Sequence, residues 1–224
     1  MLLQPLPSPF LPTPALSFFG AYLLGSVSFA LLLTRIRGIN LRKVGSGNLG
    51  ATNAGRALGR GGAILVYLLD ALKGFLPVWI LLNLSVWEVH NGDSSTGPWK
   101  CASWAGFGAW CGHVWPIYHQ FKGGKGVATL SGAFLALQPL AVLISGIALL
   151  VAAKLTRFMS IGSLAFGLAL PVSLPLLSSE ARLGGEQETV LFFGLVAGGL
   201  TFWTHRSNIT RLLKGEENSM GKQS

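Results

Sequence analysis

Seven apolar runs divide this sequence, and each could form a membrane helix or a large part of one. They cover residues 15–33, 63–84, 99–117, 127–137, 140–153, 161–177 and 190–203. A helix that crosses the roughly 30 Å hydrocarbon core of a bilayer needs about 20 apolar residues. Only 11% of the residues are charged, whereas soluble domains average about 25%. We therefore expect an all-α, polytopic membrane protein, and we exclude a soluble single domain and a disordered chain.

Residues 127–153 determine how the later segments cross the membrane, because Gln138 and Pro139 interrupt this apolar stretch. It forms either one long helix kinked at Pro139 or a hairpin of two short helices. The hairpin gathers most basic residues on one membrane face: Arg35, Arg37, Arg42, Lys43, Arg56, Arg60, Lys122, Lys125, Lys154, Arg157, Arg206, Arg211, Lys214 and Lys222. The opposite face then keeps Lys100 and Arg182 among acidic residues (Glu88, Asp93, Glu180, Glu186 and Glu188).

Cytoplasmic loops carry an excess of Lys and Arg, so we favour the hairpin. This topology has about seven transmembrane helices, the N-terminus outside and the C-terminus in the cytoplasm. Both two full spans and a partly re-entrant hairpin sheltered by neighbouring helices fit it.

Charge and cysteine content narrow the possible functions. The net charge is +9, which in an apolar chain indicates cytoplasmic loops, anionic lipids or phosphorylated substrates rather than nucleic acid. Cys101 and Cys111 lie about 15 Å apart along one expected helix, too far for a disulfide. The first residues include no basic side chain, so we expect no cleavable signal peptide. We expect one integral-membrane domain over residues 1–224, with flexible ends at 1–14 and 217–224.

The first polar motif runs from Gly45 to Asn53 and is followed by Arg56. Its glycines allow successive backbone N–H groups to converge on an anion. Neutral donors come from Ser46, Asn48, Thr52 and Asn53, and the Arg56 guanidinium suits a phosphate. A flexible polar linker is the alternative interpretation of this stretch.

The second motif, Lys122-Gly123-Gly124-Lys125-Gly126, leads directly into the apolar run that begins at Val127. Bare amides and a lysine at a helix start favour a phosphate. The pattern is not a Walker A loop, because Gly126 stands where Ser or Thr would be, so ATP and GTP are not expected. A basic turn that touches lipid headgroups is the alternative.

Other ionisable residues are candidates for the same site. Asp70 and Lys73 share one helix face inside an apolar run, where they form either a structural ion pair or part of a functional site. His113 precedes the second motif. In a third stretch, His205, Asn208 and Arg211 recur at helical spacing, which is also typical of an amphipathic tail on the membrane surface. The hairpin places all three stretches at one membrane face, which favours a single anion-binding site.

These motifs together resemble the bacterial membrane acyltransferases that transfer an acyl group from acyl phosphate to glycerol-3-phosphate. The matching segments are Gly45–Asn53 with Arg56, Asp70–Gly74, Gly112 and His113 with Pro116, Phe121–Thr129, His205 with Asn208 and Ile209, and Arg211, Leu212, Gly215 and Glu216. Leu49 and Ser28 stand where proline is common, Asn40 where aspartate is common, and Trp115 where phenylalanine is common.

The resemblance implies seven transmembrane helices, one cytoplasmic site in the bacterial inner membrane, and lysophosphatidic acid as the product. It implies that Ser46, Arg56, His205 and Asn208 serve catalysis and that Gly123, Gly124 and Gly126 hold the glycerol-3-phosphate phosphate. We add Asn48, Thr52, Asn53, Lys73, His113 and Lys125 as substrate-binding candidates, with Arg56 and Lys125 on the two phosphates. Asp70 and Glu216 are expected to give structural support.

Acyl phosphate already carries a good leaving group, so positioning and charge neutralisation are the main tasks of such an enzyme. His205, His113 or a substrate phosphate oxygen could accept the hydroxyl proton. No aspartate lies five positions after a histidine, as is common where acyl-CoA is the donor. We expect no cofactor, no metal and no obligate protein partner. A transporter for a phosphorylated metabolite and a structural lipid-binding protein are the alternatives.

Overall fold

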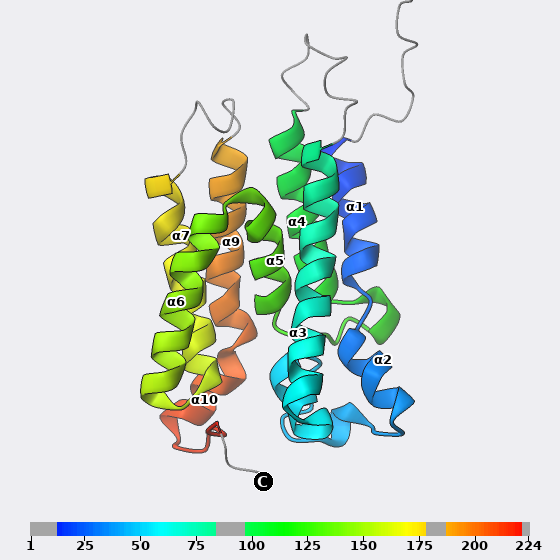
Figure 1. The fold of residues 1–224 in the computed structure, drawn as a ribbon, viewed down its shortest axis with the longest axis vertical. Coiled ribbons are helices and arrows are strands. Elements are labelled where there is room, and N and C mark those ends of the chain that lie inside the picture. The colour runs from blue at the N-terminus through cyan, green and yellow to red at the C-terminus, as the bar shows by residue number, and fades with distance from the viewer. Residues whose placement is uncertain (1–12, 84–96, 178–186, 221–224) are drawn as a thin grey trace, which may run out of the picture.

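The computed structural model describes residues 13–83, 97–177 and 187–220, and their regular structure is entirely helical. The helices lie mostly along one direction and form a bundle (Figure 1). Their bounds are α1 Pro14–Gly25, α2 Phe29–Ile36, α3 Ala51–Asn83, α4 Pro98–Val114, α5 Val127–Leu137, α6 Pro139–Thr156, α7 Met159–Leu177, α9 Gln187–Thr204 and α10 Arg206–Leu213, with short 3₁₀ helices η1 Leu41–Lys43 and η4 Ile117–His119. The all-α prediction is confirmed.

Four of the helical stretches are long and apolar enough to cross a membrane, namely Pro14–Ile36, Ala51–Asn83, Pro139–Thr156 and Met159–Leu177. Val127–Leu137 and Glu188–Thr204 are apolar but shorter. With 11 residues, α5 is about 16 Å long, roughly half of a hydrocarbon core. Most of α5 is buried, whereas α6 exposes much of its apolar surface.

Residues 127–153 form a hairpin, and the single kinked helix is wrong. Gln138 leaves the helical conformation (φ −145°, ψ 80°) between α5 and α6. The beginning of α5 and the end of α6 both meet the C-terminal segment: Lys125 binds Asn208, and Met220 N donates to the Arg157 carbonyl over 2.7 Å. The two helices therefore run in opposite directions (Figure 1).

The first apolar run, expected to be continuous, is broken between Gly25 and Phe29. The Ser28 hydroxyl caps the second piece by accepting from Leu31 N over 3.4 Å. The residues from 51 to 62, expected to belong to a polar loop, instead form the first turns of α3, which bends at Gly59 (φ 76°). The helix break at residues 26–28 and the bend of α3 at Gly59 therefore both differ from the helices expected from the apolar runs.

Close helix packing fixes α4 and α5, which carry the second motif between them. A Cβ on Gly25 would lie 2.1 Å from the Ala109 carbonyl oxygen, so α1 and α4 can touch only because this residue is glycine. A Cβ on Gly132 would lie 1.8 Å from the Ala71 carbonyl oxygen, which brings α3 against α5 in the same way. Beside these contacts, Trp110, Phe134, Phe166 and Phe193 fill a core between α4, α5, α7 and α9.

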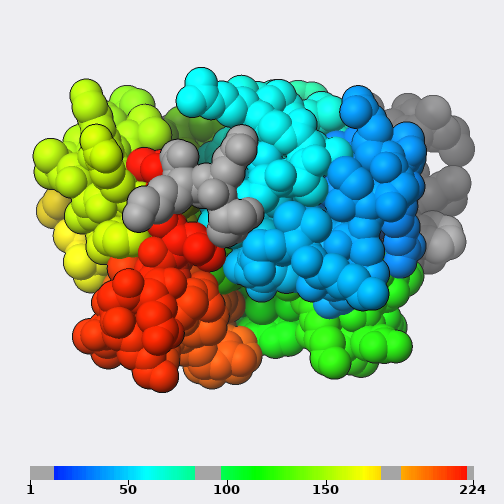
Figure 2. Space-filling model, turned by 90° about the horizontal axis from the view of Figure 1, so that it is seen from below, coloured from blue at the N-terminus to red at the C-terminus, as the bar shows by residue number. Residues whose placement is uncertain are grey.

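One end of the bundle collects the predicted motifs. Figure 2 looks at this end and shows α10 with its following residues, in orange to red, opposite α2, η1 and the beginning of α3, in blue to cyan. The last described residue, Met220, also lies at this end, where its N–H donates to the Arg157 carbonyl after α6. Of the opposite loops, those over residues 84–96 and 178–186 lie outside the described residues, and so do the acidic side chains used in the topology argument at 88, 93, 180 and 186.

Candidate active site

The second motif forms an ordered loop that ends at the first turn of α5. Gly123 N donates to the Val114 carbonyl over 3.1 Å, and Gly124 N donates to the His113 carbonyl over 3.0 Å. Gly126 adopts a left-handed conformation (φ 84°) at the start of α5, and no side chain of the described residues caps that helix. The first amides of α5 are therefore available to an anion.

Glycine is required in this loop because side chains of α4 press against it. A Cβ on Gly124 would lie 2.1 Å from His113 Nε2. A Cβ on Gly126 would lie 2.3 Å from the Nε1 atom of Trp110, and this buried indole N–H has no acceptor among the described residues. The interfacial-turn alternative does not require such contacts.

Lys125 joins all three predicted motifs. Its ammonium group donates a hydrogen bond to Asn208 Oδ1 on α10. Burial, together with the nearby charges of Arg211 and Arg56, lowers the pKa of Lys125 to about 8. The Glu217 carboxylate opposes this shift and is paired with Arg211, so Lys125 and Arg56 are the cationic groups here that a bound anion could neutralise.

A carboxylate of the C-terminal segment holds Asn208 in place. Glu217 Oε1 accepts from Asn208 Nδ2 over 2.6 Å and from Ser160 Oγ over 3.1 Å. Glu217 Oε2 accepts from Arg211 Nε over 2.7 Å. These bonds outweigh burial and lower the pKa of Glu217. Because Asn208 donates through its nitrogen to Glu217, its oxygen faces Lys125.

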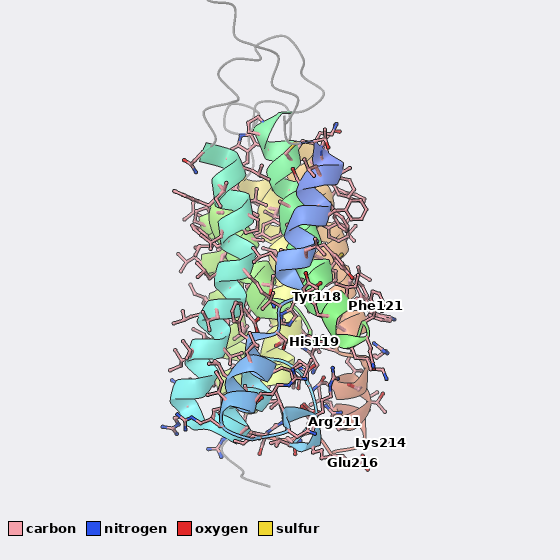
Figure 3. The ribbon with its side chains drawn as sticks, turned by 90° about the vertical axis from the view of Figure 1, so that its right-hand side faces the viewer. Tyr118, His119, Phe121, Arg211, Lys214 and Glu216 are labelled. Atoms are coloured by element: carbon pink, nitrogen blue, oxygen red, sulfur yellow. The ribbon has the colours of Figure 1, made fainter. Side chains whose placement is uncertain are left out.

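Glu216 was expected to give structural support, but among the described residues the side-chain bonds of that kind belong to its neighbour Glu217. The Glu216 side chain is exposed, and Figure 3 shows it at the outer end of the C-terminal segment with Arg211 and Lys214. The supporting carboxylate belongs to Glu217, which was expected to begin a flexible end. The sequence could not separate two adjacent glutamates, since only the direction of the chain after Gly215 (φ 71°) distinguishes them.

His205 lies where α9 ends and α10 begins, and the residue is only 2% exposed. Its Nδ1 atom is 2.8 Å from the Thr201 carbonyl oxygen, so Nδ1 carries the proton and Nε2 keeps a lone pair. Burial, together with the Lys125 charge, lowers the pKa of His205 to about 4. The imidazole is therefore neutral at pH 7, and its low pKa makes it a weak proton acceptor.

The first motif is organised by Asn53, which is buried. Its Oδ1 accepts from Ser46 N over 3.1 Å and from Arg56 Nη1 over 3.4 Å, and its Nδ2 donates to the Leu41 carbonyl over 3.3 Å. Asn53 was expected to bind substrate, but its side chain instead folds the loop. Ser46, Thr52 and Arg56 are exposed and Asn48 is half-buried, so these groups can meet a ligand.

A separate charged group lies behind the second motif. Lys73 Nζ is 2.8 Å from Asp70 Oδ1 and donates to the Val27 carbonyl over 2.7 Å. His113 Nδ1 lies 3.5 Å from the same Asp70 oxygen. The ion pair predicted from the spacing of Asp70 and Lys73 is confirmed, and His113 extends it. A small cavity of about 10 Å³, room for roughly one water molecule, adjoins this group. It is lined by Gly25, Ser26, Val27, Ser28, Leu49, Lys73, His113, Pro116, Gly123 and Gly124.

Arg42 and His119 belong to the same end of the bundle and were not predicted as site residues. Arg42 Nη2 donates to the Lys122 carbonyl over 3.1 Å and so connects η1 to the second motif. Partial burial, with the Arg35 and Arg42 charges, lowers the pKa of His119, which Figure 3 shows below Tyr118 and Phe121. The one sequence signal that could have identified Arg42 as a site residue was its position as a basic residue just before the first motif.

Known proteins are similar to this chain over nearly its whole length. The family model described as glycerol-3-phosphate acyltransferase matches residues 15–215. A glycerol-3-phosphate acyltransferase of Halalkalibacterium halodurans is 41% identical over 205 residues, covering 91% of this chain and 94% of the relative. The corresponding protein of Aquifex aeolicus is 37% identical over 198 residues, covering 88% of this chain and 94% of the relative.

Solved structures agree with the sequence comparison. The crystal structure of PlsY (YgiH), an integral membrane glycerol 3-phosphate acyltransferase, in its glycerol 3-phosphate form has a TM-score of 0.79 and 36% identity, covering 93% of this chain and 96% of that chain. The lysophosphatidic acid form has a TM-score of 0.77 and 34% identity, covering 93% and 95%.

These matches cover nearly the whole chain and include all three motifs. They exclude the transporter and the structural lipid-binding protein that the sequence left open. The chain is an integral membrane enzyme that belongs to the glycerol-3-phosphate acyltransferase family.

Proposed function

We propose that this enzyme transfers the acyl group of an acyl phosphate to the sn-1 hydroxyl of glycerol-3-phosphate and releases lysophosphatidic acid and inorganic phosphate. The observation that carries the proposal is that Lys125 and Arg56 lie close together beside the glycine loop, while Arg211 next to them is already paired with Glu217. One phosphate needs only part of this positive charge. A reaction with a phosphate on each substrate uses the rest.

Lys125 and Arg56 would bind the two phosphates, helped by the amides around Gly123, Gly124 and Gly126. Ser46, Asn48 and Thr52 would add neutral donors from the first motif. Asn208 serves by orienting Lys125, to which its oxygen is bonded. This division agrees with exposure, because Arg56 and Ser46 face solvent while Asn208 is buried.

In the reaction, the glycerol hydroxyl oxygen forms a bond to the acyl carbon while the bond from that carbon to the phosphate oxygen breaks. The hydroxyl proton passes to His205 Nε2 or to a phosphate oxygen, and phosphate leaves with the bonding electrons. The low pKa of His205 favours the second route, in which a phosphate oxygen takes the proton. Transfer is direct rather than through an acyl-enzyme, since Cys101 and Cys111 are both buried in α4.

The site would face the cytoplasm of the bacterial inner membrane, with seven membrane-crossing helices and the N-terminus outside. Supporting this orientation, the described basic residues concentrate at the end that holds the three motifs (Arg35, Arg37, Arg42, Lys43, Arg56, Arg60, Lys122, Lys125, Lys154, Arg157, Arg206, Arg211 and Lys214). Cysteine labelling at Ser46 and Ser207 from either side of sealed vesicles would test it.

Incubation of the purified enzyme with radiolabelled glycerol-3-phosphate and one acyl donor at a time tests the function. We expect labelled lysophosphatidic acid from acyl phosphate and none from acyl-CoA or free fatty acid, without added divalent metal. Product from acyl-CoA with acyl phosphate inert would overturn the donor assignment.

A further inference from the structure

The group formed by Asp70, Lys73 and His113 is not bonded to the Lys125 cluster, yet it touches the back of the same loop. We propose that Asp70 and Lys73 are positioning residues that act through His113 to hold the Gly123–Gly124 backbone in the conformation that accepts the phosphate of glycerol-3-phosphate. This inference rests on the proposed function of the loop.

Lys73 is bonded to protein on two sides. Its ammonium group is 2.8 Å from Asp70 Oδ1 and 2.7 Å from the carbonyl oxygen of Val27, in the break between α1 and α2. Helix α2 begins only at Phe29, so the Val27 carbonyl lies between two helices and Lys73 provides it with a donor. The side chain is 2% exposed. Lys73 thus connects α3 to the α1–α2 break.

His113 transmits this constraint to the loop in two ways. Asp70 Oδ1 lies 3.5 Å from His113 Nδ1, which places the carboxylate charge beside this edge of the ring. The opposite edge of the ring presses on Gly124, where a Cβ would lie 2.1 Å from Nε2. The His113 carbonyl also accepts from Gly124 N over 3.0 Å. The position of Gly124 therefore depends on where Asp70 holds the ring.

Stability alone is a weak reason for such a group. Buried ion pairs often contribute little to stability, because the cost of removing both charges from water offsets their attraction. Ionisable side chains inside a membrane protein are costly and usually functional. The small cavity beside the group is lined by Lys73, His113 and both loop glycines, so the charged group and the loop border the same space.

Three variants separate positioning from direct contact and from simple stabilisation. Lys73→Met leaves the Asp70 charge unpaired. Asp70→Leu/Lys73→Met removes both charges while keeping similar volumes. Asp70→Asn keeps the ammonium group of Lys73. It weakens the bond between residue 70 and Lys73 and the contact between residue 70 and His113. Gln138→Leu is the matched control, because Gln138 is equally buried but lies at the α5–α6 corner, away from the site. Each purified protein is compared with wild type in KM for both substrates, kcat and thermal unfolding.

If Asp70 and Lys73 position the loop, the double variant should unfold within a few degrees of the wild-type temperature. Its KM for glycerol-3-phosphate should nevertheless rise about tenfold to a hundredfold. Asp70→Asn raises the same KM about fivefold. KM for acyl phosphate stays within twofold in both variants, and Gln138→Leu keeps wild-type kinetics.

Two outcomes overturn the proposal. If Lys73→Met is impaired but the double variant has the unfolding temperature and the KM of wild type, the group only stabilises the fold. If Asp70→Asn keeps the wild-type KM, Lys73 reaches the phosphate directly. Asp70→Asn is nearly the same shape as wild type and answers the question even if the double variant fails to fold. A wild-type enzyme inactive with acyl phosphate would instead refute the proposed function, so the two failures are distinguishable.

Discussion

Replacing Lys125 by methionine tests the phosphate-binding assignment most simply. The variant Lys125→Met keeps the length and apolar stem of the side chain but removes the ammonium group. That group is bonded to Asn208 and lies near two arginines whose charges oppose it. Loss of this positive charge removes the repulsion by the arginines and also the attraction by Glu217, and it ends the cost of burying the ammonium group, so we expect the fold to persist.

The expected loss follows from one hydrogen bond between charged groups, which contributes about 1.5–3 kcal/mol. This corresponds to a decrease in kcat/KM for glycerol-3-phosphate of about 10-fold to 150-fold. Arg56 and the loop amides still bind phosphate in this variant, so the decrease in kcat/KM should be smaller than the decrease caused by removing the whole site.

The assay measures initial rates with radiolabelled glycerol-3-phosphate at saturating acyl phosphate. Lys122→Met is the control, because the Lys122 side chain is exposed three residues earlier in the same loop. We expect wild-type kinetics from this control. A folded Lys125→Met protein with kcat and KM within twofold of wild type would refute the assignment.

Three further predictions concern the loop, pH and the C-terminal segment. Gly124→Ala places a methyl group against His113 Nε2 and should lower kcat/KM about a hundredfold, whereas normal kinetics would show that the loop has room. Lys125 is charged below its pKa of about 8, so kcat/KM for glycerol-3-phosphate should fall about tenfold per pH unit above that value; a profile flat to pH 10 contradicts this. Glu217→Gln weakens the bond to Arg211 and should destabilise the fold by about 1–3 kcal/mol in denaturant unfolding, where an unchanged midpoint would argue against the carboxylate.

Apolar runs predicted the helices well because a chain in lipid must satisfy its backbone within each helix. The expected run 127–137 has the same bounds as α5, and 161–177 differs from α7 by two residues. The break at Val27 was missed because its donor, Lys73, lies 46 residues away in sequence. The glycine-rich beginning of α3 looked like a loop, since glycine disfavours helices in general.

The candidate site was predicted in outline because its residue types fit phosphate chemistry at particular places along the chain. Asp70 and Lys73 paired as their spacing indicated. That His113 joins them, and that Asn53 folds its loop rather than facing a ligand, depends on contacts between distant segments. Such contacts leave no periodic signal in one sequence.

Tracing the bridging oxygen of the donor tests acyl transfer from acyl phosphate most directly. Acyl phosphate is synthesised with ¹⁸O between the acyl carbon and phosphorus, and both products are analysed by mass spectrometry after turnover with glycerol-3-phosphate. Attack of the hydroxyl on the acyl carbon must leave all of the ¹⁸O in inorganic phosphate and none in the ester of lysophosphatidic acid. Recovery of ¹⁸O in free fatty acid, or the absence of lysophosphatidic acid, would contradict direct transfer at this site.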